Sequence, residues 1–182
     1  MEIYLIRHTT PAINKGICYG QTDLELSVNF KAEAQVVLNK LPVDIDAVYS
    51  SPLKRCLILA QKVTSEVMQE DRLKELNFGD WEMKKWDNIP LKEIQPWYDD
   101  FVNTPALNGE SYRQLADRAI NFLKELQLKN YKRVAIVTHS GIIRAMLSNL
   151  NNIALEHSFE EFNISYGEVV EITQNGYKFI GE

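Results

Sequence analysis

The stretch Ile3-Tyr4-Leu5-Ile6-Arg7-His8 joins an apolar run directly to two basic side chains. Two later segments repeat this design: Ala47-Val48-Tyr49 leads into Ser50-Ser51-Pro52-Leu53-Lys54-Arg55, and Val134-Ala135-Ile136-Val137 leads into Thr138-His139-Ser140-Gly141. Short β-rich runs followed by helical patterns are typical of parallel strands. Ligands of such sheets bind beyond the carboxyl ends of the strands. If the three runs lie in one sheet, its edge carries a pocket for an anion, with phosphate favoured, formed by Arg7, His8, Arg55 and His139.

Helical spacing of apolar residues predicts four helices around this sheet. The first covers about 27–40, and the second begins at Ser51-Pro52, where serine suits the cap and proline the first turn. The apolar face of the second helix is predicted to extend to Val67. The third begins at Ser111, in a Ser-Tyr-Arg-Gln sequence that fits a capping box, and the fourth follows Ser140.

The remaining segments complete a predicted three-layer α/β/α fold with a mostly parallel central sheet. Asn175-Gly176 lies between the apolar runs 169–172 and 177–180, which predicts a C-terminal hairpin at one edge. Residues 76–107 are irregular and contain all three tryptophans, so we expect a small helical excursion over the site. We predict a single domain spanning 1–182.

Composition limits the possible partners and location. The net charge of −5 argues against a nucleic-acid partner, and anion affinity must come from local arginines. The N-terminus lacks the basic and apolar regions of a signal peptide, and no apolar stretch approaches the roughly 20 residues that span a bilayer. We therefore expect a cytoplasmic protein, monomer or homodimer, with no membrane partner. Cys18 and Cys56 are expected to be reduced, and without further Cys or a spaced His pair we predict neither a metal nor a cofactor.

His8 is the candidate nucleophile of this pocket. A neutral imidazole can attack phosphorus and form a phosphohistidine, which divides one difficult displacement into two easier ones. Neighbouring arginine charges favour the neutral ring. Arg7 and Arg55 can place their planar donors on phosphoryl oxygens, and His139, if protonated, adds another donor. The amides at the helix start near Gly141 also attract anions.

The leaving oxygen needs a proton, which calls for a carboxylic acid near the phosphate. Glu75, in Arg72-Leu73-Lys74-Glu75-Leu76-Asn77-Phe78-Gly79, is the first candidate. Glu82, in Gly79-Asp80-Trp81-Glu82, is the second, with the alternative that it only positions the loop through hydrogen bonds.

These motifs, taken together, resemble the histidine phosphatase superfamily, the phosphoglycerate-mutase-like group. The resemblance runs in order through Arg7-His8-Thr9, Ser50-Ser51-Pro52-Leu53-Lys54-Arg55, Leu73-Lys74-Glu75 with Phe78-Gly79-Asp80-Trp81-Glu82, and Val137-Thr138-His139-Ser140-Gly141. It implies that His8 is phosphorylated, that Arg7, Arg55 and His139 form the phosphate pocket, and that Glu75 is the proton donor. It further places Asn14 on the phosphate. The family usually has Arg-His-Gly-Glu-Thr, whereas this chain has Arg7-His8-Thr9-Thr10-Pro11, which we interpret as a subgroup trait.

Within the superfamily, three segments look most like α-ribazole phosphatases: Cys18-Tyr19-Gly20-Gln21-Thr22-Asp23, Trp86-Asp87-Asn88-Ile89-Pro90 and Asn108-Gly109-Glu110-Ser111. The implied substrate is a small phosphate monoester, α-ribazole 5′-phosphate or adenosylcobalamin 5′-phosphate, in cobalamin nucleotide-loop assembly. We expect the substrate-binding set to include Gly20, Gln21, Glu82 and Ser140.

Three other functions remain open from the sequence. A phosphoglycerate mutase would use the same charged residues, but mutases carry a longer segment between the two halves. A broad-specificity or protein phosphatase is a second alternative, although typical small protein phosphatases lack the region around Trp81 and Glu82. A binding module with an inactive pocket is the third, and the persistence of every charged member argues against it.

Overall fold

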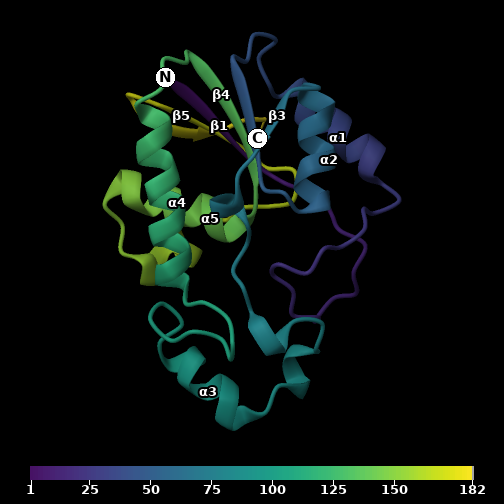
Figure 1. The fold of residues 1–182 in the computed structure, drawn as a ribbon, viewed down its shortest axis with the longest axis vertical. Coiled ribbons are helices and arrows are strands. Elements are labelled where there is room, and N and C mark those ends of the chain that lie inside the picture. The colour runs from purple at the N-terminus through teal and green to yellow at the C-terminus, as the bar shows by residue number, and fades with distance from the viewer. Residues whose placement is uncertain (182) are drawn as a thin grey trace.

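The computed structural model describes residues 1–181 and is built on one six-stranded sheet, in the order β3-β2-β4-β1-β5-β6 (Figure 1). The strands are β1 (Glu2–Arg7), β2 (Ala47–Ser50), β3 (Val67–Gln69), β4 (Arg133–Thr138), β5 (Val169–Thr173) and β6 (Gly176–Phe179). The first four run parallel to one another, β5 is antiparallel to β1, and β6 to β5. The predicted mostly parallel sheet with a C-terminal hairpin at one edge is confirmed.

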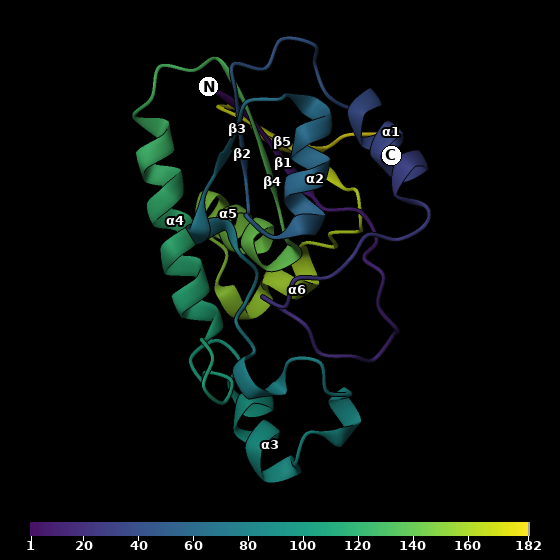
Figure 2. The same cartoon turned by 45° about the vertical axis from the view of Figure 1, so that its right-hand side comes forward.

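Helices cover both faces of the sheet, as the three-layer prediction requires (Figures 1 and 2). Side chains alternate along each strand, so Leu5 and Ile136 pack against one pair of helices, while Ile6 and Val137 pack against the other. The first pair is α4 (Tyr112–Gln127) with α5 (Ser140–Asn151), and the second is α1 (Phe30–Asn39) with α2 (Lys54–Val63). Within residues 1–181, no helix is both long enough and apolar enough to cross a bilayer.

The helix starts agree with the sequence in one case and differ in another. Ser111 and Gln114 form the predicted reciprocal capping box at the start of α4. The prediction that α2 begins at Ser51-Pro52 is wrong: the helix begins at Lys54, with no side-chain cap. The Ser51 hydroxyl accepts the backbone N–H of Leu53 at 3.4 Å, before the helix begins, and lies 2.9 Å from His139 Nε2.

Val67 does not extend the apolar face of α2, contrary to the prediction. The helix ends at Val63, and Thr64 takes an extended conformation that turns the chain out of the helix. Val67 then opens β3, where it pairs with Val48 of β2. A three-residue edge strand is too short to give a clear alternating pattern, which is why the sequence did not reveal it.

The excursion at 76–107 contains short helical pieces, as predicted, and extends beyond the carboxyl ends of the parallel strands (Figure 1). It includes the 3-10 turns η2 (Gly79–Trp81) and η3 (Trp86–Asn88) and the helix α3 (Leu91–Asp99). The excursion has a small core of its own, formed by Trp81, Ile89, Ile94 and Ala106 with Cys18 from the N-terminal part of the chain. The remaining short elements are η1 (Asp71–Leu73), η4 (Leu155–His157) and α6 (Ser158–Glu161).

The sheet core should dominate stability. Ile136 is fully buried in β4, between β1 and β2. We predict that Ile136→Ala lowers the free energy of unfolding by about 2–5 kcal/mol, because it removes buried methyl groups and leaves a cavity. Urea denaturation measures this, with the exposed Val43→Ala as the matched control. Equal losses for the two variants would contradict the packing described here.

Candidate active site

His8 follows β1 directly, and its imidazole is almost completely buried. Its Nδ1 lies 2.7 Å from the carbonyl oxygen of Thr9. A carbonyl can only accept, so Nδ1 must carry the proton and donate it. This leaves the lone pair on Nε2, and the ring is thereby prepared to act as a nucleophile through that atom.

The charge around His8 favours the neutral ring. Burial lowers the pKa of the imidazole well below its ordinary value, and the guanidinium groups of Arg55 and then Arg7 lower it further. The prediction that His8 is uncharged next to two arginines therefore has a physical basis in the structure. A neutral ring is also the form that can attack phosphorus.

Arg55 and Arg7 are held by backbone carbonyls and keep unused donors. Arg55 is fully buried in α2 and donates to the carbonyl oxygens of Thr22 and Gly20, at 2.9 and 2.5 Å. Arg7 donates to the carbonyl oxygen of Ile164 at 2.6 Å. Within residues 1–181 the buried Nε atoms of both arginines have no acceptor. Buried donors without acceptors are costly, and an anion beside His8 would offset that cost.

His139 completes the basic cluster from the end of β4. Its ring is fully buried and meets the His8 ring edge-on, with 5.1 Å between the centroids. Burial, followed by the charge of Arg55, lowers the pKa of His139 well below its ordinary value. The ring is therefore neutral without a ligand, and a bound dianion would favour its protonated form.

Glu75 is anchored at the start of α5, on the same side of the site. One carboxylate oxygen accepts the backbone N–H of Leu76 at 3.0 Å, and the other accepts that of Gly141 at 3.2 Å. A Cβ atom at position 141 would lie 2.3 Å from the carboxylate, so glycine there makes room for the acid. The helix N-terminus thus fixes Glu75 beside the cavity that holds His8.

Arg118, which the sequence analysis did not single out, holds the backbone that carries Glu75. Its guanidinium donates to the carbonyl oxygens of Arg72, Lys74 and Glu75, at 2.7, 2.6 and 3.0 Å. It also pairs with the Glu110 carboxylate at 2.6 Å. Binding three nearby carbonyls with one side chain fixes the path of this irregular segment. No sequence pattern marks such carbonyl contacts in advance.

Glu82 has a positioning role in the structure. Its carboxylate accepts the backbone N–H groups of Gln21, Thr22 and Phe78, and it does not line the cavity that holds His8 and Glu75. It therefore closes the loop that brings the Gly20 carbonyl to Arg55. This geometry supports the positioning alternative for Glu82, and of the two candidate acids only Glu75 lines the cavity.

The predicted substrate-binding residues fall into three groups. Ser140 lines the cavity, as expected. Gly20 and Gln21 lie in its supporting wall: a Cβ on Gly20 would come within 1.8 Å of the Leu76 carbonyl oxygen, and the Gln21 amide donates to the Glu75 carbonyl oxygen at 3.1 Å. Asn14 is exposed and borders a separate depression, so the structure does not bring it into the site. Before Asn14, Pro11 forms an isolated bridge with Leu26.

The cavity itself is small, with a volume of about 160 Å³. Arg7, His8 and Glu75 line it, whereas Arg55 and His139 are fully buried and are not among its lining residues. It is also lined by side chains that the sequence analysis did not assign to the site, namely Tyr112, Leu115, Arg144 and Phe159. The position of Arg144, four residues after Ser140, was the one signal that could have revealed it.

Two tyrosines pack over the arginines. The ring of Tyr166 lies 3.9 Å from Cζ of Arg7, and its hydroxyl lies 2.6 Å from the hydroxyl of Tyr19. The ring of Tyr19 in turn lies 5.5 Å from Cζ of Arg55. These contacts shield the guanidinium groups from solvent and add cation–π attraction.

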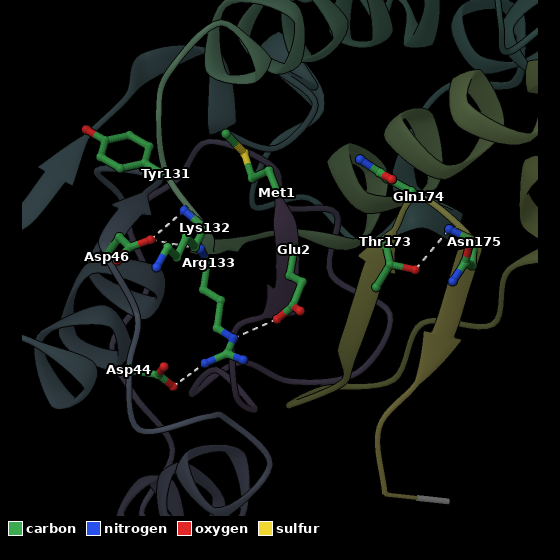
Figure 3. Close-up of a pocket in the computed structure, with 10 residues that line it drawn as sticks. All are labelled: Met1, Glu2, Asp44, Asp46, Tyr131, Lys132, Arg133, Thr173, Gln174 and Asn175. Atoms are coloured by element: carbon green, nitrogen blue, oxygen red, sulfur yellow. Dashed lines mark hydrogen bonds and ion pairs between the residues drawn. The ribbon is translucent and has the colours of Figure 1, made fainter.

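A larger depression of about 700 Å³ lies at the opposite, amino ends of β1 and β4 (Figure 3). Its charged groups neutralise one another: Arg133 forms ion pairs with Glu2 and Asp44, and Asp46 accepts the backbone N–H groups of Lys132 and Arg133. No histidine or cysteine lines this depression. Among residues 1–181, no group of His, Cys, Asp and Glu side chains has the arrangement of a metal site.

Comparisons with known proteins agree with this geometry. The family model of the histidine phosphatase superfamily (branch 1) matches residues 3–180. A putative phosphoserine phosphatase 2 of Hydrogenobacter thermophilus is 27% identical over 97% of this chain and 91% of its own. The adenosylcobalamin/alpha-ribazole phosphatase of Escherichia coli is 26% identical over 96% of this chain and 91% of its own. The crystal structure of the alpha-ribazole phosphatase from Shigella flexneri superposes with a TM-score of 0.87, at 26% identity, over 98% of this chain and 94% of that one.

The two buried imidazoles should make stability depend on pH. Their folded-state pKa values lie below the ordinary one, so the unfolded chain binds protons that the folded chain does not. The free energy of unfolding is therefore not reduced by these rings above about pH 6.5. Below that pH it falls, by up to about 1.4 kcal/mol per pH unit for each ring. Chemical denaturation from about pH 7.5 to 5.5 measures the slope. It should be shallower in His8→Gln, and an unchanged slope would show that His8 is not buried as a neutral ring.

Proposed function

Because the chain belongs to the histidine phosphatase superfamily, we propose that it hydrolyses phosphate monoesters through a phosphohistidine on His8. The single observation that supports this most is the combination of a free Nε2 on a neutral His8 with unpaired donors on both neighbouring arginines. Both features support an attack by His8 on a phosphoryl group bound by the two arginines.

In the first step, His8 Nε2 attacks phosphorus and the bond from phosphorus to the ester oxygen breaks. Arg7 and Arg55 stabilise the charge that spreads over the phosphoryl oxygens. Glu75, in its protonated form, gives its proton to the departing oxygen, so that an alcohol leaves instead of an alkoxide. The imidazole retains the phosphoryl group, and Glu75 is left as a carboxylate.

In the second step, Glu75 takes a proton from a water molecule, whose oxygen attacks phosphorus. The bond from phosphorus to Nε2 breaks, and its electron pair returns to the imidazole. Inorganic phosphate leaves, and Glu75 is again protonated. The backbone N–H groups of Leu76 and Gly141 stabilise the carboxylate between the two steps.

α-Ribazole 5′-phosphate, or adenosylcobalamin 5′-phosphate, is one candidate substrate. The likeness of the chain to the α-ribazole phosphatases of Escherichia coli and Shigella flexneri supports it. The aromatic side chains Tyr112 and Phe159 offer a surface on which a flat base could stack.

A smaller phosphate monoester, such as phosphoserine, is the second candidate. The cavity of about 160 Å³ is below the roughly 300–1,000 Å³ that is usual for sites of drug-sized ligands. The similarity to a putative phosphoserine phosphatase is of the same order as the similarity to the α-ribazole enzymes. A panel of phosphate monoesters compared by kcat/KM, with 3-phosphoglycerate included, decides between them. Release of inorganic phosphate, instead of an isomerised phosphoglycerate, separates this function from that of a mutase.

The nucleophile is tested by replacing His8. We predict that His8→Ala lowers the hydrolysis of p-nitrophenyl phosphate by at least about 10³-fold, because no other group can accept the phosphoryl group. The exposed His157→Ala is the matched control and should retain activity. When the wild-type reaction is stopped in alkali, labelled phosphate should stay on histidine. When it is stopped in acid, the label should be lost, since phosphohistidine is acid-labile. Full activity of His8→Ala would mean that another group is the nucleophile, whereas a wild-type protein without activity would favour the binding-module alternative.

The acid is tested by comparing two glutamates. We predict that Glu75→Gln lowers kcat by roughly 10²–10⁴-fold, the usual range for a general acid. The loss should be larger for an alkyl phosphate than for p-nitrophenyl phosphate, because nitrophenolate can leave without a proton. Glu82→Gln should show no such dependence on the leaving group, since its carboxylate holds a loop. The opposite pattern would make Glu82 the acid.

A further inference from the structure

Arg144 is a cation in the active-site cavity for which the proposed reaction has no use. It lies on α5, one helical turn after Ser140, and lines the cavity together with Glu75 and Phe159. A helical side chain leans toward the N-terminus of its helix, and in α5 that is the end that anchors Glu75. Arg144 and Glu75 therefore share the cavity in which the leaving group must lie.

The guanidinium is fixed in place but not neutralised. Its Nε donates to the carbonyl oxygen of Phe162 at 3.0 Å, and its Cζ lies 4.5 Å from the ring centroid of Phe159. These contacts leave the two terminal nitrogens available. Burial lowers the pKa of Arg144, which reports the cost of keeping a positive charge partly dehydrated.

The other arginines show that this arrangement is selective. Of the six arginines that are not exposed, Arg72, Arg118 and Arg133 each form an ion pair with a carboxylate. The remaining three, Arg7, Arg55 and Arg144, have no such partner within residues 1–181 and all belong to the active site. The first two surround His8 and so account for the phosphoryl group. Arg144 is left to meet a second anionic group.

The geometry favours a carboxylate as that group. Two parallel N–H donors of a guanidinium match the two oxygens of a carboxylate, and Arg144 itself is only partly exposed in the cavity that it lines. Glu75 protonates the leaving oxygen, so a group that reaches Arg144 from there belongs to the leaving alcohol. The small cavity limits that alcohol to a few atoms.

We propose that Arg144 binds a carboxylate on the leaving group, so that the enzyme selects small acidic phosphate monoesters such as phosphoserine. This inference rests on the proposed phosphatase activity and names its substrate class. It assigns Arg144 to specificity, whereas Arg7 and Arg55 serve every substrate alike.

The test uses two substrates that differ only in the carboxylate, O-phosphoserine and O-phosphoethanolamine, with p-nitrophenyl phosphate as the reference. Wild-type protein should prefer phosphoserine, and Arg144→Gln should lower kcat/KM for phosphoserine by about 10- to 100-fold, the range expected for a charge-assisted pair. The other two substrates should change by less than about 3-fold. Arg144→Lys should recover part of the preference. Arg113→Gln, which alters an exposed arginine outside the cavity, is the matched control.

The results that overturn the inference differ from those that overturn the proposed function. An equal loss of kcat/KM on all three substrates would indicate that Arg144 has a structural role. A lower unfolding temperature of Arg144→Gln would then accompany that loss. An unchanged ratio of phosphoserine to phosphoethanolamine, or a preference for α-ribazole 5′-phosphate that Arg144→Gln leaves intact, would also remove the inference. In each case hydrolysis of p-nitrophenyl phosphate would still establish the phosphatase. Wild-type protein that hydrolyses no monoester and forms no phosphohistidine would instead overturn the function itself.

Discussion

The constraint on which the site depends is the burial of two guanidinium groups beside an imidazole, with no ion-paired carboxylate for either guanidinium among residues 1–181. Such an arrangement is unfavourable in a folded protein unless other groups compensate for it. Here the carbonyl oxygens of Gly20, Thr22 and Ile164 supply the compensation, together with the rings of Tyr19 and Tyr166. Because these partners are neutral, the net positive charge is preserved for a ligand. A carboxylate in their place would have competed with phosphate for the same donors.

The sheet provides the rigidity that this arrangement needs. His8 and His139 follow β1 and β4, which are adjacent parallel strands, so their backbones are fixed by the register of the pairing. Arg55 enters from α2, directly after β2 on the other side of β4. The proposed acid, Glu75, is positioned in a different way. Glu75 lies in an irregular segment and is held by α4 through Arg118, by the start of α5 and by the loop that Glu82 closes.

This difference explains how much could be predicted from the sequence. The strand ends gave His8, Arg55 and His139, because parallel strands bring their carboxyl ends to one edge whatever the loops do. The capping box at Ser111 was predictable because it is local. Asn14 was placed on the phosphate by resemblance, yet the loop after Pro11 leads it to the surface. Arg118 and Arg144 act through carbonyls and a cavity wall from distant elements, and such contacts leave no periodic or adjacent signal.

The three backbone contacts of Arg118 have an evolutionary consequence. They attach the backbone of Glu75 to α4, whereas His8 is held by the sheet. The proposed acid and the proposed nucleophile are therefore positioned by different elements of the fold. Insertions, deletions or exchanges in the tryptophan-rich excursion between them can reshape what the pocket accepts while the phosphoryl-transfer chemistry stays as it is. Related proteins with this fold can therefore acquire different substrates through sequence changes in one peripheral segment, while the reaction itself is retained.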